Sequence, residues 1–400
     1  MSISIQTVGG AAQLALDCAG GVLRAIETMH ATISARTAGM SSGAVSPQFS
    51  SATYTLLKVA HEGFSEAVVR GFRGVSNLSS TPVEGAASIG AVAALNGICG
   101  DHLEATQNPL AIRMSLRTLA ATVNPTPEGI AGVCTRVTPH IVVWIHGLCL
   151  SEQNWTRNKR ESMGERLQRD LGFTPVYLRY NSGRHISTNG RELSEQLERL
   201  IEAWPIPAAS LTLIGHSMGG LVLRSAGWYG ERDARAWREK LRNVVCLGAP
   251  HHGSPLEKGG EFITRAIAAS PYLETLAFGR ARSAGIKDLR HGNLLDEDWR
   301  SADSCDGADR RVPVPLIPGV NYYFAAATVG RHAYDPKGRI LGDLLVRTGS
   351  ATGSHRDPRK HIDIAPENCR VFHNMNHFDL LDHPQVYEQL VRWLAPEQSR

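Results

Sequence analysis

The chain has 400 residues, more than a typical single domain, so one large domain with an appendage is expected. Hydrophobic residues make up 42% and charged residues 20%, which is the balance of an ordinary globular protein. The formal net charge of +4 is small for this length, and the basic residues are scattered. Nucleic acid is therefore excluded as an expected partner.

Cysteines and terminal segments indicate the compartment. The seven cysteines form no CxxC pair, so neither a disulfide framework nor a zinc site is indicated. The N-terminus lacks a basic region before its apolar stretch, which Asp17 interrupts. No apolar run reaches the roughly 18 residues of a membrane span. With no signal peptide or transmembrane segment evident, a cytoplasmic location is expected.

Residues 1–120 are predicted to form an N-terminal helical extension. Apolar residues recur at helical spacing over 14–33 and 60–72, and 81–100 is an Ala-rich helical stretch. The stripes are typical of packing between helices or against another domain. An appendage for substrate entry or for peripheral contact with a membrane surface is left open, although Lys and Arg are few on these helices.

Residues 121–400 are predicted to form an α/β domain. Apolar runs such as "HIVVWIHG", "SLTLIG", "NVVCLGAP" and "NYYFAAAT" alternate with helical patterns such as "RELSEQLERLIEAW". This alternation favours a mostly parallel sheet with helices on both faces, and the near-continuous apolar runs are typical of buried strands. Residues 251–318 interrupt the alternation and are expected to form a cap, or lid, over one end of the sheet.

Ser217 is the candidate nucleophile. It lies in "GHSMG", between a predicted strand ending near Gly215 and a predicted helix starting near Gly219. Glycines on both sides allow the tight turn that holds a serine hydroxyl clear of a sheet. The alternative is a glycine-rich helix start with a capping serine.

A serine hydroxyl needs a base, and in a turn of this kind the acid and the base follow the serine in that order. His377 lies in a short polar loop between the predicted strand "CRVFHN" and the last helix, and it is the candidate base. The neighbouring His373 and His383 are interpreted as structural or surface residues.

The candidate acid is Asp343, with Asp335 as the competitor. Both follow the predicted strand "NYYFAAAT". Asp335 stands in "YDPKG", which is typical of a surface turn. Asp343 precedes the apolar "LLV", so its carboxylate is expected in drier surroundings, where it would orient the imidazole and stabilise it when protonated.

Two main-chain N–H groups are the expected oxyanion hole, because a tetrahedral intermediate needs donors directed at its negative charge. One is that of Met218, directly after the candidate nucleophile, and the other is that of Leu148, after the early strand. Gly147 lets this backbone turn inward, and His146 is expected to hold the loop by bonding its backbone.

Five segments together resemble the α/β-hydrolase superfamily, and most closely its lipase-like and GPI-inositol-deacylase-like (PGAP1-like) bacterial members: "HGLCL", "GHSMGG", "LGAPHHGS", "GDLLV" and "NMNHFDLL". The resemblance covers residues 138–396 and implies an α/β-hydrolase fold with Ser217 as nucleophile, Asp343 as acid and His377 as base. Leu344 departs from the glycine that usually follows the acid. Secreted relatives often bind calcium near the histidine, where Asp379 would lie, but no second aspartate ligand is evident, and neither metal nor cofactor is expected.

The expected function is a serine carboxylic-ester hydrolase, an esterase or lipase that forms an acyl-enzyme with a small-molecule or lipid ester bearing an apolar acyl group. Two alternatives stay open: transfer of the acyl group to an alcohol by the same triad, and a non-catalytic binding module with a hydrolase fold. The sequence predicts no oligomeric state.

Overall fold

The computed structural model describes residues 86–159, 161–254, 283–300, 309, 311–332, 335 and 342–395. The chain divides into two compact units. The larger comprises residues 86–101, 112–269 and 282–400, and the smaller comprises 1–85, 102–111 and 270–281. Only residues 102–111 of the smaller unit are described, so the helical stripes over 14–33 and 60–72 lie outside the described residues. The domain boundary at residue 120 stays a prediction.

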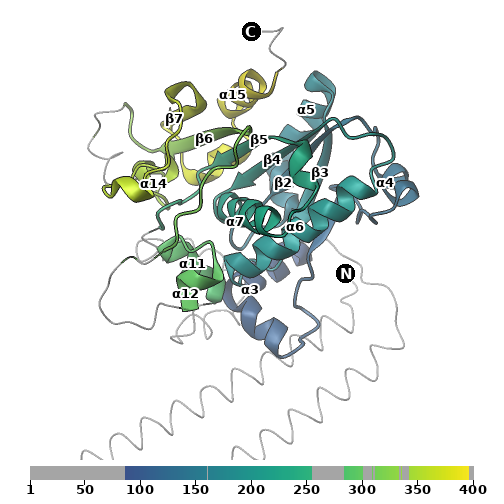
Figure 1. Ribbon diagram of the computed structural model, residues 1–400, viewed down its shortest axis with the longest axis horizontal. Coiled ribbons are helices and arrows are strands. Elements are labelled where there is room, and N and C mark those ends of the chain that lie inside the picture. Colours follow the sequence, from purple (N-terminus) through teal and green to yellow (C-terminus); the bar gives the residue numbers. More distant parts are fainter. Residues whose placement is uncertain are drawn as a thin grey trace, which may run out of the picture. The chain divides into compact units, whose positions relative to one another are not determined.

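A seven-stranded, mostly parallel sheet forms the centre of the larger unit (Figure 1). Its order is β1-β3-β2-β4-β5-β6-β7, and only β1 runs antiparallel, against β3. The strands are β1 Ser115–Arg117, β2 His140–Ile145, β3 Thr174–Arg179, β4 Ser210–His216, β5 Leu241–Leu247, β6 Asn321–Thr328 and β7 Cys369–His373. The predicted fold class is confirmed, and β1 shows that the sheet begins before residue 121.

The central strands are apolar on both faces because helices cover both. Every residue of β2 except His140 is buried, as is every residue of β6 except Asn321. Parallel pairing places Ile145 beside Gly215 and His216 beside Leu247, so the carboxyl ends of β2, β4 and β5 share one edge. In open α/β sheets this edge is where ligands bind.

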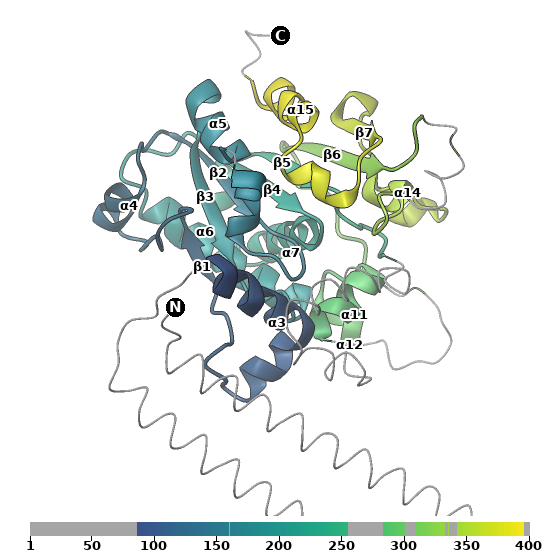
Figure 2. The ribbon, with the colours of Figure 1, turned by 180° about the vertical axis from the view of Figure 1, so that it is seen from behind.

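Four helices make the two outer layers: α5 Met163–Leu171, α6 Ile186–Glu202, α7 Met218–Arg232 and α15 Pro384–Leu394. In Figure 1 the strands run from β7 on the left to β3 on the right, with α5 and α15 above them and α6 and α7 below. Figure 2 gives the same layers from behind. A capping box at Ser162 and Glu165 fixes the start of α5, and left-handed Gly172 ends it.

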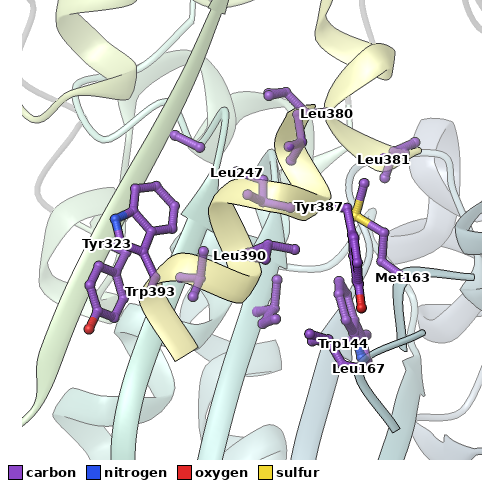
Figure 3. Close-up of a cluster of buried hydrophobic side chains, with 14 of the residues drawn as sticks. Trp144, Met163, Leu167, Leu247, Tyr323, Leu380, Leu381, Tyr387, Leu390 and Trp393 are labelled. Carbon is purple, nitrogen blue, oxygen red and sulfur yellow. The ribbon is translucent and has the colours of Figure 1, made fainter. Parts of the chain in front are cut away.

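The core on the α5 and α15 side is rich in aromatic side chains (Figure 3). Tyr323 of β6 stacks on Trp393 of α15 with ring centroids 5.0 Å apart. Trp144 of β2 lies edge-on to Trp155 at 4.8 Å. Leu380 and Leu381 join the same core from the segment that follows His377, so this segment is anchored in the apolar interior.

Shorter elements complete the described residues: α3 Ala86–Ala105, α4 Pro127–Val133, η1 Glu152–Lys159, α8 Trp237–Lys240, α11 Ala284–His291, α12 Asp296–Arg300, α14 Thr348–Ala351, η2 Pro358–Lys360, η3 Pro366–Asn368 and η4 His377–Leu381. Helices α11 and α12 fall within the predicted cap, residues 251–318, much of which lies outside the described residues. Across the described residues, none of the helices has the length and apolar character to cross a bilayer.

Candidate active site

Ser217 occupies a strained turn between β4 and α7. Its φ of 55° and ψ of −123° lie outside the regions that most residues adopt. The turn closes only because its neighbours are glycines. A Cβ at Gly215 would lie 2.5 Å from the carbonyl carbon of Gly219, and one at Gly219 would lie 2.3 Å from the carbonyl oxygen of Ile145. The steric reason given for both glycines therefore holds in the structure.

Main-chain hydrogen bonds hold this turn to the sheet. The N–H of Ser217 donates to the carbonyl of Leu247 at 2.8 Å, and the N–H of Gly220 donates to the carbonyl of Ser217 at 3.0 Å. The Ser217 side chain caps no helix N–H. The alternative of a capping serine is therefore not supported by the geometry.

His377 begins the short helix η4, and its loop is fixed from both sides. Asn376 and Asp379 form a capping box, in which the Asp379 carboxylate accepts the N–H of Asn376 at 2.8 Å. Leu380 and Leu381 are buried in the aromatic core. The His377 ring is itself buried, and its Nε2 has no hydrogen-bond partner in the described structure.

Asp343, and not Asp335, lies against His377. The Nδ1 of His377 is 2.6 Å from the Oδ2 of Asp343, which is buried. The other oxygen, Oδ1, accepts the N–H groups of Leu345 at 3.0 Å and Val346 at 2.7 Å. A carboxylate satisfied in this way holds the imidazole with Nδ1 protonated and Nε2 free to accept a proton.

The competing residues have other roles. The carboxylate of Asp335 accepts the N–H of Arg331 at 2.9 Å. The turn predicted at "YDPKG" lies outside the described residues apart from Asp335. His383 is the N-cap of α15 and accepts the N–H of Gln385. His373 ends β7 and lines a separate, larger cavity.

Met218 and Leu148, the candidate oxyanion-hole residues, both lie near Ser217. Met218 is the first residue of α7, where helix geometry leaves an N–H without an intrahelical acceptor. Leu148 lines the same cavity as Ser217 and His377. The approach is close, because a Cβ on the preceding Gly147 would lie 3.0 Å from the Cβ of Ser217.

His146 holds the loop that carries Leu148. Its Nδ1 is 2.9 Å from the carbonyl of Gly147, its Nε2 is 3.4 Å from the N–H of Tyr180, and its ring stacks on the Tyr180 ring at 4.3 Å. A neutral ring that donates from Nδ1 and accepts at Nε2 satisfies both contacts. Burial lowers the pKa of His146 to about 4, which keeps the ring neutral.

Two supports of the site were missed by reasoning from the sequence. His216, inside the "GHSMG" segment, places its Nε2 3.1 Å from the main-chain carbonyl of His377. Helix α3 backs the Leu148 loop, because a Cβ on Gly97 would lie 2.3 Å from the Sγ of Cys149. Nothing in the sequence around His216 predicts its contact with His377. Gly97 lies inside a helical pattern, and a glycine at such a position is a weak signal of close packing.

A narrow cavity opens at Ser217, with a volume of about 20 Å³. It is lined by Gly147, Leu148, Leu150, His216, Ser217, Pro250, Ser254, Leu289, Leu345, Val346, His377 and Phe378. Most of these side chains are apolar. A larger cavity of about 960 Å³ shares Ser254 with it and is lined by five histidines and three arginines.

Among the residues with described positions, no group of three or more His, Cys, Asp and Glu side chains is arranged to hold a metal ion. Asp379 is the residue considered for calcium. Its carboxylate accepts hydrogen bonds from the main-chain nitrogen of Asn376 at 2.8 Å and from the side-chain nitrogen of Asn376 at 2.7 Å.

Residues 136–303 match the family model described as "PGAP1-like alpha/beta domain". The larger unit has the α/β-hydrolase fold. Ser217 follows β4, Asp343 follows β6 and His377 follows β7. This is the chain order in which serine, acid and histidine occur in that fold.

No curated protein matches the chain. Among solved structures, the mature Bacillus licheniformis lipase BlEst2 is similar at 17% identity and a TM-score of 0.43, over 66% of this chain and 96% of the lipase. The type II thioesterase YbtT of the yersiniabactin pathway is similar at 17% identity and a TM-score of 0.39, over 65% and 94%. The Pyrococcus furiosus esterase Pf2001 is similar at 13% identity and a TM-score of 0.36, over 64% and 80%.

Proposed function

We propose that the hydrolase domain is a serine carboxylic-ester hydrolase that acts on an ester with an apolar acyl group. One observation carries the proposal. Ser217 and His377 line one cavity, His377 bonds through Nδ1 to a buried carboxylate, and none of the residues that the structure describes is a hydrogen-bond partner of its Nε2. A base prepared in this way has one free nitrogen, and the hydroxyl it would serve lies in the same cavity.

The reaction begins with attack of the Ser217 oxygen on the ester carbonyl carbon, while Nε2 of His377 takes the hydroxyl proton. Asp343 stabilises the imidazolium that results. The N–H groups of Met218 and Leu148 stabilise the negative oxygen of the tetrahedral intermediate. His377 then gives its proton to the departing alcohol, which leaves an acyl group on Ser217.

Water completes the cycle. His377 takes a proton from water as the water oxygen attacks the acyl-enzyme, and the carboxylic acid leaves as Ser217 regains its proton. The residues around Ser217 favour an apolar acyl group. A volume of about 20 Å³ holds roughly one water, so a long acyl chain requires lining side chains to move.

The test is hydrolysis of p-nitrophenyl esters of graded acyl length by the wild type and by Ser217→Ala. The substitution should leave the circular dichroism spectrum unchanged and lower kcat by roughly 10⁴-fold or more, the size of effect seen when a triad member is removed. Labelling by a fluorophosphonate probe should be lost with it. Wild-type activity in the alanine variant would move the nucleophile elsewhere, and a wild type that neither turns over nor labels would favour a binding module.

A further inference from the structure

A second cavity, of about 480 Å³, lies beside the hydrolase site without sharing any lining residue with the Ser217 cavity. Its volume is in the range of small-molecule sites. The segment after β5 separates the two: Pro250 lines the Ser217 cavity, and His251 and His252 line the second one. These histidines belong to the "APHHGS" segment, to which the proposed reaction gives no role.

A buried cation forms part of its wall. Arg224 of α7 is only 6% exposed, its Nη2 donates to the carbonyl of Val314 at 2.7 Å, and its Nε has no hydrogen-bond partner in the described part of the chain. No carboxylate of the described residues forms an ion pair with it. The other buried arginine of the described chain, Arg179, is held by the carboxylate of Glu152. Burying an unpaired charge is costly, and burial accordingly lowers the pKa of Arg224.

His251 adds a second unsatisfied donor. Its Nδ1 lies 3.4 Å from Nη1 of Arg224, so Nδ1 is the acceptor of that contact and the ring proton is on Nε2. That Nε2 has no partner among the described residues, and the ring is buried against Phe324 with centroids 4.3 Å apart. Burial lowers the pKa of His251 well below its ordinary value, which keeps the ring neutral. Arg224 therefore brings to the wall a positive charge that no carboxylate of the described residues neutralises, whereas the unsatisfied Nε of Arg224 and Nε2 of His251 are themselves buried.

The remaining groups do not supply the missing anion. Asp298 already accepts the main-chain N–H groups of Leu294, Leu295 and Val312. The carboxylate of Asp363 lies on an exposed residue. The rest of the lining includes an apolar side made by Leu294, Val312, Pro313, Val314, Pro315, Leu316 and Ile362.

We propose that this cavity is a second ligand site, which takes a carboxylate or phosphate group joined to a short apolar chain. The anionic group lies toward Arg224, and the apolar chain lies along residues 312–316. Carboxylate and phosphate oxygens both accept paired hydrogen bonds from the guanidinium group of an arginine. An apolar chain would pack against the proline-rich side of the cavity. The site is independent of the proposed hydrolase reaction, since it uses none of the residues of the Ser217 cavity.

Calorimetric titration with octanoate, octyl phosphate, octanol and inorganic phosphate tests the proposal, on the wild type and on Ser217→Ala alike. Octanoate or octyl phosphate should bind with one-to-one stoichiometry, and octanol and inorganic phosphate should each bind at least about 10-fold more weakly, because each lacks one half of the ligand. Arg224→Met should weaken binding by about 10- to 100-fold. Arg232→Met, on the same helix and paired with exposed Asp233, is the matched control and should bind as the wild type does.

Because removal of a buried arginine can disturb folding, a second pair of variants tests the location. Leu316→Trp fills this cavity from a half-buried loop position and should abolish binding, whereas Leu345→Trp, in the Ser217 cavity, should not. Equal binding of octanol and octanoate would overturn the anionic half of the proposal. Binding that survives Leu316→Trp but is lost in Leu345→Trp would place the ligand in the Ser217 cavity and overturn the second site.

Discussion

Backbone strain in the described chain gathers around the candidate site. Six non-glycine residues have positive φ, and four of them lie in the segments that carry the candidate residues: Cys149, Ser217, Leu344 and Asn374. Such conformations cost of order 1–3 kcal/mol each and persist only where the surroundings enforce them. The geometry at Ser217 is thus maintained by its neighbours at the expense of stability.

Leu344 offers a direct measure of this strain. Its φ is 82°, and it is 54% exposed. A glycine adopts this conformation without a Cβ clash, so Leu344→Gly should raise the free energy of unfolding by about 1 kcal/mol. Urea unfolding followed by circular dichroism would measure it.

The adjacent Leu345 is the matched control. It is half-buried, packs against a small core cluster and does not have positive φ, so Leu345→Gly should lower stability. Equal destabilisation by both substitutions would show that the backbone at Leu344 is not strained.

The two candidate acids can be separated by one substitution each. Asp343→Asn should lower kcat for an activated ester by roughly 10⁴-fold, because an amide neither fixes the required tautomer nor stabilises the imidazolium. Asp335→Asn should change kcat little, since the Asp335 carboxylate accepts a hydrogen bond from the main-chain N–H of Arg331. Steady-state kinetics on both variants, with folding checked by circular dichroism, would decide. A larger loss in the Asp335 variant would reassign the acid.

At the scale of elements, α3 is more than an appendage to the sheet. Up to Asp101 it belongs to the larger unit. The side-chain amide of Asn181 donates to the carbonyl of Gly100 at 2.8 Å, and the N–H of Ala284 donates to the carboxylate of Asp101 at 2.9 Å. Through Gly97 the helix touches Cys149, directly after Leu148.

Gly97→Val should therefore impair the site through α3. The new side chain would collide with Sγ and the main chain of Cys149 at 2.3–2.9 Å, and overpacking of this kind costs about 1–3 kcal/mol. We expect a lower kcat with little change in KM, because displacement of Leu148 weakens stabilisation of the transition state.

Gly90→Val in the same helix is the control, since a Cβ there meets nothing within 4 Å. It should leave both kcat and the unfolding midpoint close to the wild type. Equal kcat and KM values in the two variants would show that the packing of α3 does not affect the Leu148 loop.

Local patterns identified most of the elements but not the contacts between them. The apolar runs at β2, β4, β5 and β6 are long enough to be recognised, whereas the three residues of β1 carry too little pattern. Ser217 and His377 could be proposed from short motifs and chain order. The bond from His216 to the carbonyl of His377 joins residues 161 apart, and the contact of Gly97 with Cys149 depends on how α3 docks. Such contacts follow from tertiary packing, which no local pattern encodes.

At the scale of the whole molecule, buried neutral histidines couple stability to pH. Burial lowers the pKa of His146 from an ordinary 6.5 to about 4, so between these values the unfolded chain binds a proton that the folded chain does not. Stability therefore falls as pH drops from 6.5 toward 4, by up to about 1.4 kcal/mol per pH unit for this group. His251 shifts stability in the same direction.

Urea unfolding at intervals between pH 7.5 and pH 4.5 would measure this dependence, and His146→Gln should flatten it. Paired carboxylates such as Asp357, whose pKa is lowered to about 2 chiefly by Arg359, lose their stabilising effect mainly below about pH 5. The slopes are therefore compared above that pH. The same pH slope in wild type and variant would show that His146 is not the residue that titrates.

The double link between Asp343 and His377 has a consequence for how this domain can change in evolution. Besides the bond between their side chains, the N–H of His377 donates to the carbonyl of Asp343 at 3.2 Å. Two hydrogen bonds therefore join the ends of the segment between these residues, which are 34 positions apart. For a flexible loop closed at its base, each doubling of length costs only about 0.6 kcal/mol. Insertions between residues 364 and 366, outside β7 and outside the lining of the second cavity, are therefore expected to accumulate without moving Asp343 from His377, and this is where the domain can vary most freely in length.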